Sequence, residues 1–374
     1  MLYDKIDVFM VRFEGRLGKI WTGVVLAFIL LILAAIYVRP ECNYVGAGVS
    51  FEKLANNPFN YSETNIYAFR IMTPLISYLI GLRGKLFMVT NAIFALIFIF
   101  MVFSHFRKLY SRPADALFAA GIMTFSSVIL VMLFNSGWCD ILTYLAIFAM
   151  WHWRRNFWLF TLFFAVGLFN HDSVMFLLPW LIAIRLTGGN KKVTILLLTL
   201  LSMGLVMALY FIYRNWVTSQ MGVTLSMSYY LQPLLKDPLY WMSEKVPYYP
   251  LGWFTAFKIL WVIPIAGCYL AWKEGQKWQS VLMAMPVVLA AAQLVIAIDT
   301  TRMFTLGFMS MILALEYFYS SNEDRLRKYL PALFAMNFIV PQMYTAGFKI
   351  QLMPSTPMNL LRMWLDNKPW WPYP

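Results

Sequence analysis

Long apolar runs recur along nearly the whole chain, and a small cluster of Lys or Arg closes each run. Of the 374 residues, 61% are hydrophobic and 13% are charged, against roughly 25% charged residues in soluble domains. About 20 consecutive apolar residues suffice for a helix to cross the hydrocarbon core of a bilayer. The runs are continuously apolar, whereas the strands of a membrane barrel alternate polar and apolar residues. The sequence therefore predicts an all-α fold, a polytopic bundle of membrane helices.

Eleven segments are predicted to span the bilayer. They are residues 20–38, 86–104, 116–135, 138–153, 157–170, 173–187, 193–213, 256–272, 280–298, 303–319 and 329–347. No low-complexity linker interrupts them, so we predict a single membrane domain over residues 1–374. Residues 1–19 are amphipathic, which is typical of a helix in the membrane interface. Outward loops are predicted at 39–85 and 214–255, and an outward aromatic tail at 348–374.

Residues 71–82 set the orientation of every later loop. The segment is too short to cross about 30 Å of hydrocarbon at 1.5 Å per residue, and Pro74 interrupts it. If this segment lies in the interface, the segments on the cytoplasmic side hold 17 Lys and Arg, and the short turns on the outer side hold only Arg302. The cytoplasmic segments are 1–19, 105–115, 154–155, 185–192, 273–277 and 323–328, and the outer turns are 136–140, 170–172 and 299–302. Because basic loops stay on the cytoplasmic side, we predict the N-terminus inside and the C-terminus outside.

The net charge of +13 follows from the same distribution of basic residues. These residues are spread in small groups between the apolar runs rather than gathered on one segment. We therefore expect them to face the bilayer surface and the cytoplasm, and we expect no nucleic acid partner.

Three predicted outward turns carry acidic residues to one face of the membrane. They are the turns with Asp140, with the triplet Asn170-His171-Asp172, and with Asp299 and Arg302. An ionised Asp in hydrocarbon costs on the order of 2.5–3.5 kcal/mol. The segment 157–187 is short for two crossings, so its tip should lie in a recess below the membrane surface. We expect these residues to converge on one water-accessible cavity that opens outward.

Each of these turns also has a simpler interpretation. Asp140 and Asp172 could cap the helices that follow them, and Asp299 could form only a local ion pair with Arg302. A carboxylate beside a cation can instead act as a general base, and the fork of Arg302 suits a phosphate. A divalent metal held by the three carboxylates is a further alternative. The single external His171 supplies too few ligands for zinc.

The stretch YAFRIMTPLISYLIGLRGKLFMVTNAIFALIF, residues 67–98, contains an Arg, a Pro four residues later, an amphipathic stretch and then a span. This order resembles the first outward loop of the GT-C superfamily, polytopic glycosyltransferases that use polyprenyl- or dolichyl-phosphate-linked sugars. The turns GWCDILTYL, FNHDSVMFLLPWL and DTTRMFTL look like later outward turns of bacterial relatives. In topology the resemblance covers about residues 20–320.

The resemblance implies an enzyme of a bacterial inner membrane, with a cytoplasmic N-terminus and a periplasmic C-terminus. Such an enzyme moves a sugar from a polyprenyl-phosphate donor to a glycan or lipid acceptor of the cell envelope, on the outer face. A carboxylate deprotonates the acceptor hydroxyl, and Arg70 or Arg302 holds the departing phosphate. Asn170, His171 and Asp299 are the further predicted substrate contacts.

The catalytic carboxylate is the point at which this chain departs from the superfamily. Members carry an Asp or Glu early in the first outward loop, and the matching stretch here is NYVGAGVSFEKLANN, with Glu52 as the nearest acid. Either Glu52 or Glu63 is the base, or Asp140 or Asp172 is, or the chain is not a transferase. Two rival functions therefore stay open. One is a transporter or flippase for a lipid-linked or anionic solute, and the other is a polysaccharide polymerase or acyltransferase.

Overall fold

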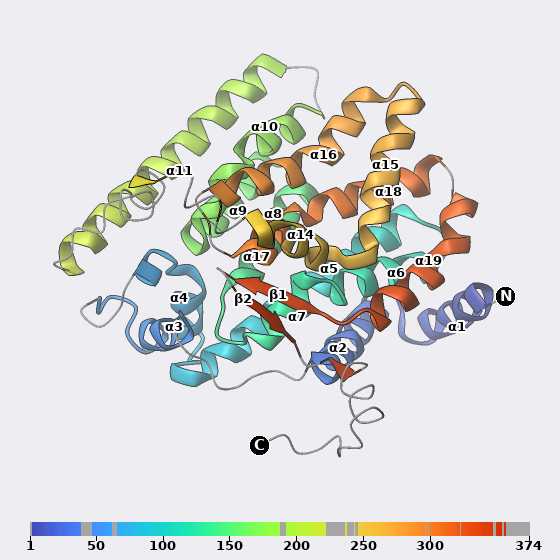
Figure 1. Ribbon diagram of the computed structural model, residues 1–374, viewed down its shortest axis with the longest axis horizontal. Helices are drawn as coiled ribbons and strands as arrows, with labels where there is room; N and C mark the ends of the chain where they lie inside the picture. Colours follow the sequence, from blue (N-terminus) through green and yellow to red (C-terminus); the bar gives the residue numbers. More distant parts are fainter. Residues whose placement is uncertain are drawn as a thin grey trace.

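The computed structural model of the protein is a bundle of helices, with one short β-hairpin in the residues that the structure describes (Figure 1). These residues are 2–38, 47–61, 66–187, 192–221, 236–237, 243, 246–295, 297, 299–321, 323–346, 349–353 and 355–356. Among them, six helical stretches are long and apolar enough to cross a membrane. They are Lys19–Val38, Gly84–Leu109, Lys192–Met221, Val246–Lys273, Lys277–Val295 and Thr300–Ser320. The protein is therefore an integral membrane helix bundle, and the number of eleven spans stays a prediction.

The six stretches are built in two ways. Some consist of one long helix, as in α2 (Lys19–Val38), α5 (Phe87–Leu109), α11 (Lys192–Met221) and α16 (Lys277–Ala292). Others join two helices through a 3-10 turn. These are α14 (Tyr249–Phe257) with α15 (Val262–Lys273), and α17 (Thr300–Thr305) with α18 (Met309–Ser321). The turn after α14 begins at Lys258, whose φ of 51° is rare for a residue with a side chain.

The helices nearest the polar turns are shorter than a bilayer is thick. These helices are α8 (Asp140–His152), α9 (Phe157–Asn170) and α10 (Leu178–Leu186), and a 3-10 turn over Asp172–Leu177 precedes α10. At 1.5 Å per residue, a helix of 14 residues such as α9 reaches only about 21 Å. Nearly every residue of α8 is buried, and the helix packs between α5 and α9. Protein rather than lipid surrounds α8, so its length need not match the hydrocarbon thickness.

The predicted continuous span 116–135 is corrected by the structure. Two helices replace it, α6 (Pro113–Thr124) and α7 (Ser127–Phe134), and they are bent by 45°. The hydroxyl of Ser126 accepts a hydrogen bond from the backbone N–H of Val128, and the hydroxyl of Ser127 donates to the carbonyl of Ala256. Serine side chains that bond to backbone groups compete with the helical ladder, and this competition explains the break.

The predicted last span, 329–347, is also wrong in its second half. Helix α19 (Glu323–Ile339) ends before Pro341, which has no backbone N–H to donate to the helical ladder. The chain then forms strand β1 (Met343–Ala346), which pairs antiparallel with β2 (Lys349–Leu352). The all-α prediction therefore missed one hairpin. Half of the second outward loop and residues 357–374 of the predicted tail lie outside the described residues.

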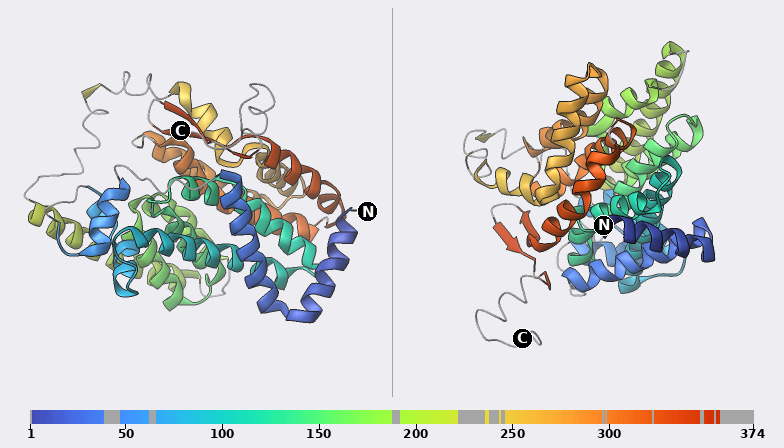
Figure 2. Two further views of the ribbon diagram at one scale, coloured as in Figure 1. Left: turned by 90° about the horizontal axis from the view of Figure 1, so that it is seen from below. Right: turned by 90° about the vertical axis from the view of Figure 1, so that its right-hand side faces the viewer.

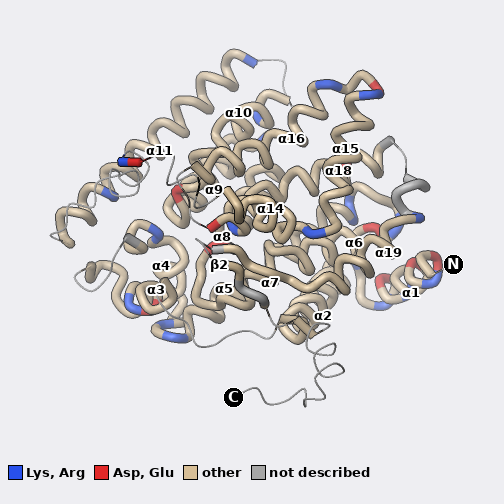
Figure 3. The backbone as a smooth tube through the Cα atoms, viewed as in Figure 1, with Lys and Arg blue, Asp and Glu red and all other residues tan. Residues whose placement is uncertain are grey.

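The first outward loop contains two short helices, α3 (Ala47–Asn56) and α4 (Met72–Leu79). Helix α4 covers most of the predicted interfacial segment, and its 8 residues cannot cross a bilayer. At the other end of the bundle, α1 (Leu2–Leu17) turns into α2 through Gly18, whose φ is 77°; the two helices diverge from this turn (Figure 2). Lys and Arg gather on α1 and at the turn between α15 and α16 (Figure 3). Lys53 is the one basic residue of α3, and Arg70 and Arg83 flank α4.

The orientation of the bundle can be tested by cysteine labelling in a variant that lacks the three native cysteines. Ser111 and Asn60 are both exposed and lie in an inner and an outer segment of the predicted topology. We expect Asn60→Cys to react with a membrane-impermeant maleimide in intact cells, and Ser111→Cys to react only after permeabilisation. The opposite pattern would invert the predicted orientation.

Candidate functional site

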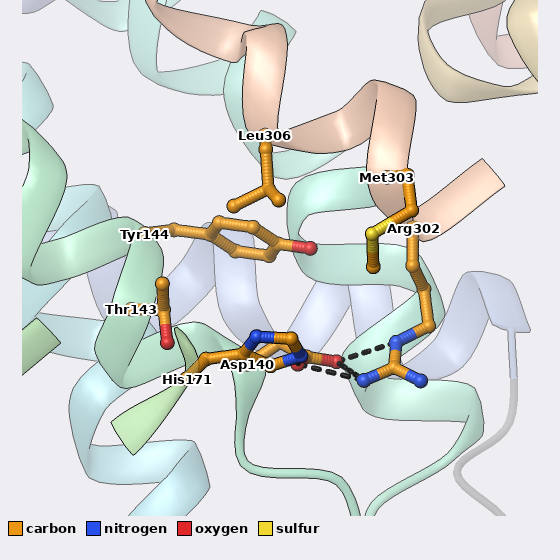
Figure 4. Close-up of a pocket in the computed structure, with 7 residues that line it drawn as sticks. All are labelled: Asp140, Thr143, Tyr144, His171, Arg302, Met303 and Leu306. Atoms are coloured by element: carbon orange, nitrogen blue, oxygen red, sulfur yellow. Dashed lines mark hydrogen bonds and ion pairs between the residues drawn. The ribbon is translucent and has the colours of Figure 1, made fainter. Parts of the chain in front are cut away.

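The centre of the polar cluster is an ion pair between Asp140, the first residue of α8, and Arg302 in α17. The Nε and Nη2 atoms of Arg302 donate to the two carboxylate oxygens of Asp140 at 2.7 and 2.8 Å, and Nη1 donates to Asp299 at 2.5 Å. The guanidinium also lies 4.0 Å above the ring of Trp138. Only 8% of Asp140 and of Arg302 is exposed. The pair is thus buried and covered by the ring of Trp138, and its bidentate contact is drawn in Figure 4.

His171 links this pair to the rest of the cluster. It follows α9, and its Nδ1 atom accepts a hydrogen bond from the backbone N–H of Ser173 at 3.1 Å. The neutral ring therefore carries its proton on Nε2, which lies 3.7 Å from Oδ1 of Asp140. Burial lowers the pKa of His171, and the charge of Arg70 lowers it further. The ring is therefore neutral at pH 7.

Asp172 forms the open end of the cluster. Its Oδ1 atom lies 3.3 Å from Nδ1 of His171. Arg70, which precedes α4, approaches the carboxylate at 3.9 Å, and Arg214 of α11 approaches it at 3.6 Å. Both separations exceed a hydrogen bond. The Asp172 side chain is 39% exposed, against 24% for Arg70 and 8% for Arg214. Both guanidinium groups therefore reach Asp172 without binding it tightly.

The charges of the whole cluster balance. Three acidic and three basic side chains contribute to it: Asp140, Asp172, Asp299, Arg70, Arg214 and Arg302. The closed end consists of Asp140, Asp299 and Arg302, which are two carboxylates and one guanidinium. The open end consists of Asp172, Arg70 and Arg214, which are one carboxylate and two guanidinium groups. Buried charges are tolerated when they are paired and hydrogen-bonded. This balance, rather than a large wet cavity, explains how the polar triplet 170–172 lies within an apolar run.

Asn170 holds three helices together at the edge of the cluster. Its amide nitrogen donates to the carbonyl of Cys139 at 2.7 Å and to the hydroxyl of Thr143 at 2.9 Å. Its amide oxygen accepts from the hydroxyl and the backbone N–H of Thr73. These four bonds use the full capacity of the side chain. Asn170 therefore positions α4, α8 and α9 and has no bonding capacity left for a substrate.

A small cavity lies beside the buried ion pair (Figure 4). It is lined by Asp140, Thr143, Tyr144, His171, Arg302, Met303 and Leu306. The space has room for about one water molecule, far less than the roughly 300–1,000 Å³ of a ligand pocket. The predicted water-accessible recess is therefore only a small cavity beside the ion pair.

Hydroxyl groups behind Arg302 fix α17 in place. The hydroxyl of Thr301 accepts from the backbone N–H of Thr345 in β1 and lies 2.9 Å from the hydroxyl of Thr255 in α14. Helix α14 approaches so closely that a Cβ atom at Gly252 would lie 2.4 Å from Thr300. Glycine is therefore required there. The β-hairpin and α14 together set the position from which Arg302 reaches Asp140.

The structure brings together seven of the predicted site residues: Arg70, Asp140, Asn170, His171, Asp172, Asp299 and Arg302. Glu52 is not among the residues that line the cavity; it lies on α3, and Glu63 falls outside the described residues. No group of three or more metal-binding side chains occurs in the described ranges. Arg302 occupies both oxygens of Asp140, so a metal ion held by these carboxylates would have to displace it.

Sequence reasoning missed two residues of the cluster. Arg214 follows the apolar run 193–213 and is easily taken for a flanking charge at the end of a span. In the structure α11 continues to Met221, and Arg214 is a buried part of it. Trp138 was also missed, because no periodicity marks a residue that stacks on a cation from another helix.

Comparison with models of protein families finds no match to this chain, and comparison with curated proteins finds none either. The fold and the cluster therefore define only a class of protein. The chain is an integral membrane helix bundle with a charge-balanced polar cluster at one end of its buried helices.

The buried ion pair should dominate the stability of this region. Removing one partner of a buried pair costs about 3–5 kcal/mol, because the other charge is left unpaired. We expect Arg302→Gln to lower the melting temperature strongly, because it leaves the carboxylates of Asp140 and Asp299 without their guanidinium partner. Asp140→Asn should lower it less, because Arg302 keeps its contact with Asp299. The double variant should recover part of the loss caused by Arg302→Gln. Thermal unfolding in detergent measures this. The exposed pair Asp4–Arg112 is the matched control, with an expected effect below about 1 kcal/mol. Additive losses in the double variant would contradict the coupling.

Asp172 should make stability depend on pH in the acid range. Burial raises the pKa of its carboxyl, but the charges of Arg70 and Arg214 outweigh this and lower the pKa below its ordinary value. The contribution of the ionised Asp172 carboxylate to the free energy of unfolding is therefore complete above the unfolded pKa of about 3.9. It is lost as the pH falls toward the lower pKa of the folded protein.

We expect the melting temperature of the wild type to fall more steeply between about pH 4 and pH 2 than that of Asp172→Asn. Equal slopes for the two proteins would show that Asp172 gains nothing from its neighbours.

Proposed function

We propose that the protein is a GT-C-like glycosyltransferase of a bacterial inner membrane. It transfers a sugar from a polyprenyl-phosphate donor to a glycan or lipid acceptor at the outer face. The observation that carries the proposal is the open end of the cluster, where two largely buried arginines face one accessible carboxylate at 3.6 and 3.9 Å. Guanidinium groups match phosphate oxygens in geometry and charge, and this end of the cluster has one positive charge in excess.

The geometry favours Asp172 over Asp140 as the base. Both oxygens of Asp140 accept from Arg302, whereas the carboxylate of Asp172 is partly exposed and lacks a hydrogen bond from either neighbouring arginine. Asp172 takes the proton of the acceptor hydroxyl while the hydroxyl oxygen forms a bond to the anomeric carbon. The bond from that carbon to the phosphate oxygen breaks, and the phosphate leaves with the electron pair.

Arg70 and Arg214 stabilise the negative charge that grows on the departing phosphate. Asp140 and Arg302 do not react in this scheme. They hold α8 and α17 together beside His171, and so fix the turn that carries Asp172. Glu52 has no role in this version of the mechanism, which replaces a base in the first loop by a base in the turn 170–172.

The rival functions have less support. A transporter needs a polar path between the two faces. The second polar group of the bundle joins His105, Glu316 and Trp151, with Glu316 Oε1 at 2.6 Å from Nε2 of His105 and 2.9 Å from Nε1 of Trp151. Helix α8 links this group to Asp140 through residues that are buried and mainly apolar. An acyltransferase would need a basic nitrogen on His171, whose Nδ1 is already engaged by Ser173.

Binding and transfer can be separated by substitution. We expect Arg70→Gln and Arg214→Gln each to weaken the binding of polyprenyl phosphate by about 10–100-fold, since a hydrogen bond to a charged group contributes about 1.5–3 kcal/mol. Asp172→Asn should abolish transfer and leave this binding intact or tighter, because it removes a competing carboxylate.

Thermal shift with added polyprenyl phosphate measures binding, and sugar release from a panel of polyprenyl-phosphate sugars in nanodiscs measures transfer. Arg83→Gln removes the same charge from an exposed position in the same loop and is the matched control. Wild-type binding by Arg70→Gln and Arg214→Gln, or full transfer by Asp172→Asn, would refute the proposal.

A further inference from the structure

The acidic side chains of α1 all contact the neighbouring end of α5 or start of α6, or the Arg112 between them. The carboxylate of Glu14 accepts from Nε and Nη2 of Arg107 at 3.0 and 2.9 Å. Asp7 accepts from the backbone N–H of Ala114, and Asp4 lies 3.6 Å from Arg112. The acidic residues of α1 are thus engaged by the end of α5, the start of α6 and Arg112 between them, and only Asp4 is largely exposed.

The basic side chains of α1 form a separate stripe. Lys5, Arg12 and Arg16 are exposed, and none of them pairs with an acid in the part of the chain that the structure describes. Their spacings of 7 and 4 residues place them on one face of a helix with 3.6 residues per turn. The stripe therefore offers three positive charges that have no acidic partner among the described residues.

An apolar stripe lies next to the basic one. Leu2 and Phe9 are 64% and 61% exposed, and the ring of Phe9 stacks on that of Phe13 at 5.8 Å. The apolar surface continues past the turn at Gly18 onto α2, where Ile20 and Trp21 are 70% and 65% exposed. Because α2 is long and apolar enough to span a membrane, the apolar stripe of α1 lies where the hydrocarbon begins.

We propose that α1 is a binding site for anionic phospholipid headgroups at the bilayer surface. Lys5, Arg12 and Arg16 bind the phosphate-bearing headgroups, while Leu2 and Phe9 enter the boundary of the acyl chains. Helices with adjacent basic and apolar stripes bind membranes in this way, and each basic residue near an anionic surface contributes to the attraction. Through Glu14 and Arg107, the bound lipid also steadies the inner end of α5.

Lipid titration of the purified full-length protein in mild detergent tests this proposal. Phosphatidylglycerol and phosphatidylcholine of the same chain length are added separately, and bound lipids are counted by native mass spectrometry alongside thermal unfolding. We expect the wild type to bind phosphatidylglycerol preferentially. The variant K5Q/R12Q/R16Q should lose about 100-fold of this preference, which corresponds to about 1 kcal/mol for each basic residue.

The matched control K192Q/K273Q/K277Q removes three exposed positive charges from other inner loops and should keep the preference. A triple variant of α1 that still selects phosphatidylglycerol would overturn the proposal, and so would an equal loss in the control. The result does not depend on the proposed transferase activity, because neither variant touches the cluster around Asp172 and both should bind polyprenyl phosphate as the wild type does.

Discussion

The ion pair between Asp140 and Arg302 is the interaction on which the rest of the polar cluster depends. Both side chains lie within the bundle, where an unpaired charge would be strongly unfavourable. Arg302 reaches Asp140 only because α17 is fixed by hydroxyl contacts from α14 and by the β-hairpin. The ion pair in turn holds the start of α8, and Asn170 connects that point to α4 and α9.

The two ends of the cluster differ in how tightly their charges are paired. At the closed end, Arg302 saturates two carboxylates and leaves little room for a ligand. At the open end, Asp172 holds two arginines apart without a hydrogen bond to either. The cluster therefore combines a tightly bonded end with an end whose charges are only loosely paired.

The short helices around the cluster follow from the same constraint. A helix that meets lipid must carry apolar side chains over the full hydrocarbon thickness. Helix α8 is surrounded by protein, so it can begin at a charged residue and end after 13 residues. The longer α11 faces lipid over most of its length and contributes only Arg214 to the cluster. Burial among other helices thus allows charge at a depth where lipid would not.

The sequence by itself determined the class of fold and the convergence of the polar turns. Apolar runs of membrane length predict helices, and α2 and α9 lie almost where expected. Short hairpins between consecutive helices bring their tips to one face, which is why Asp140, Asp172 and Arg302 could be predicted to meet. Local pattern and chain connectivity contain all of this information.

Only the tertiary structure decided which charges pair and which stay open. The bidentate contact between Asp140 and Arg302 depends on the relative position of two helices 162 residues apart, and no periodicity encodes that position. Arg214 joined the cluster because α11 extends beyond its apolar run. The break between α6 and α7 depends on a bond from Ser127 to Ala256 in α14. These features depend on packing between distant segments, and hydrophobic patterns record only which residues are buried.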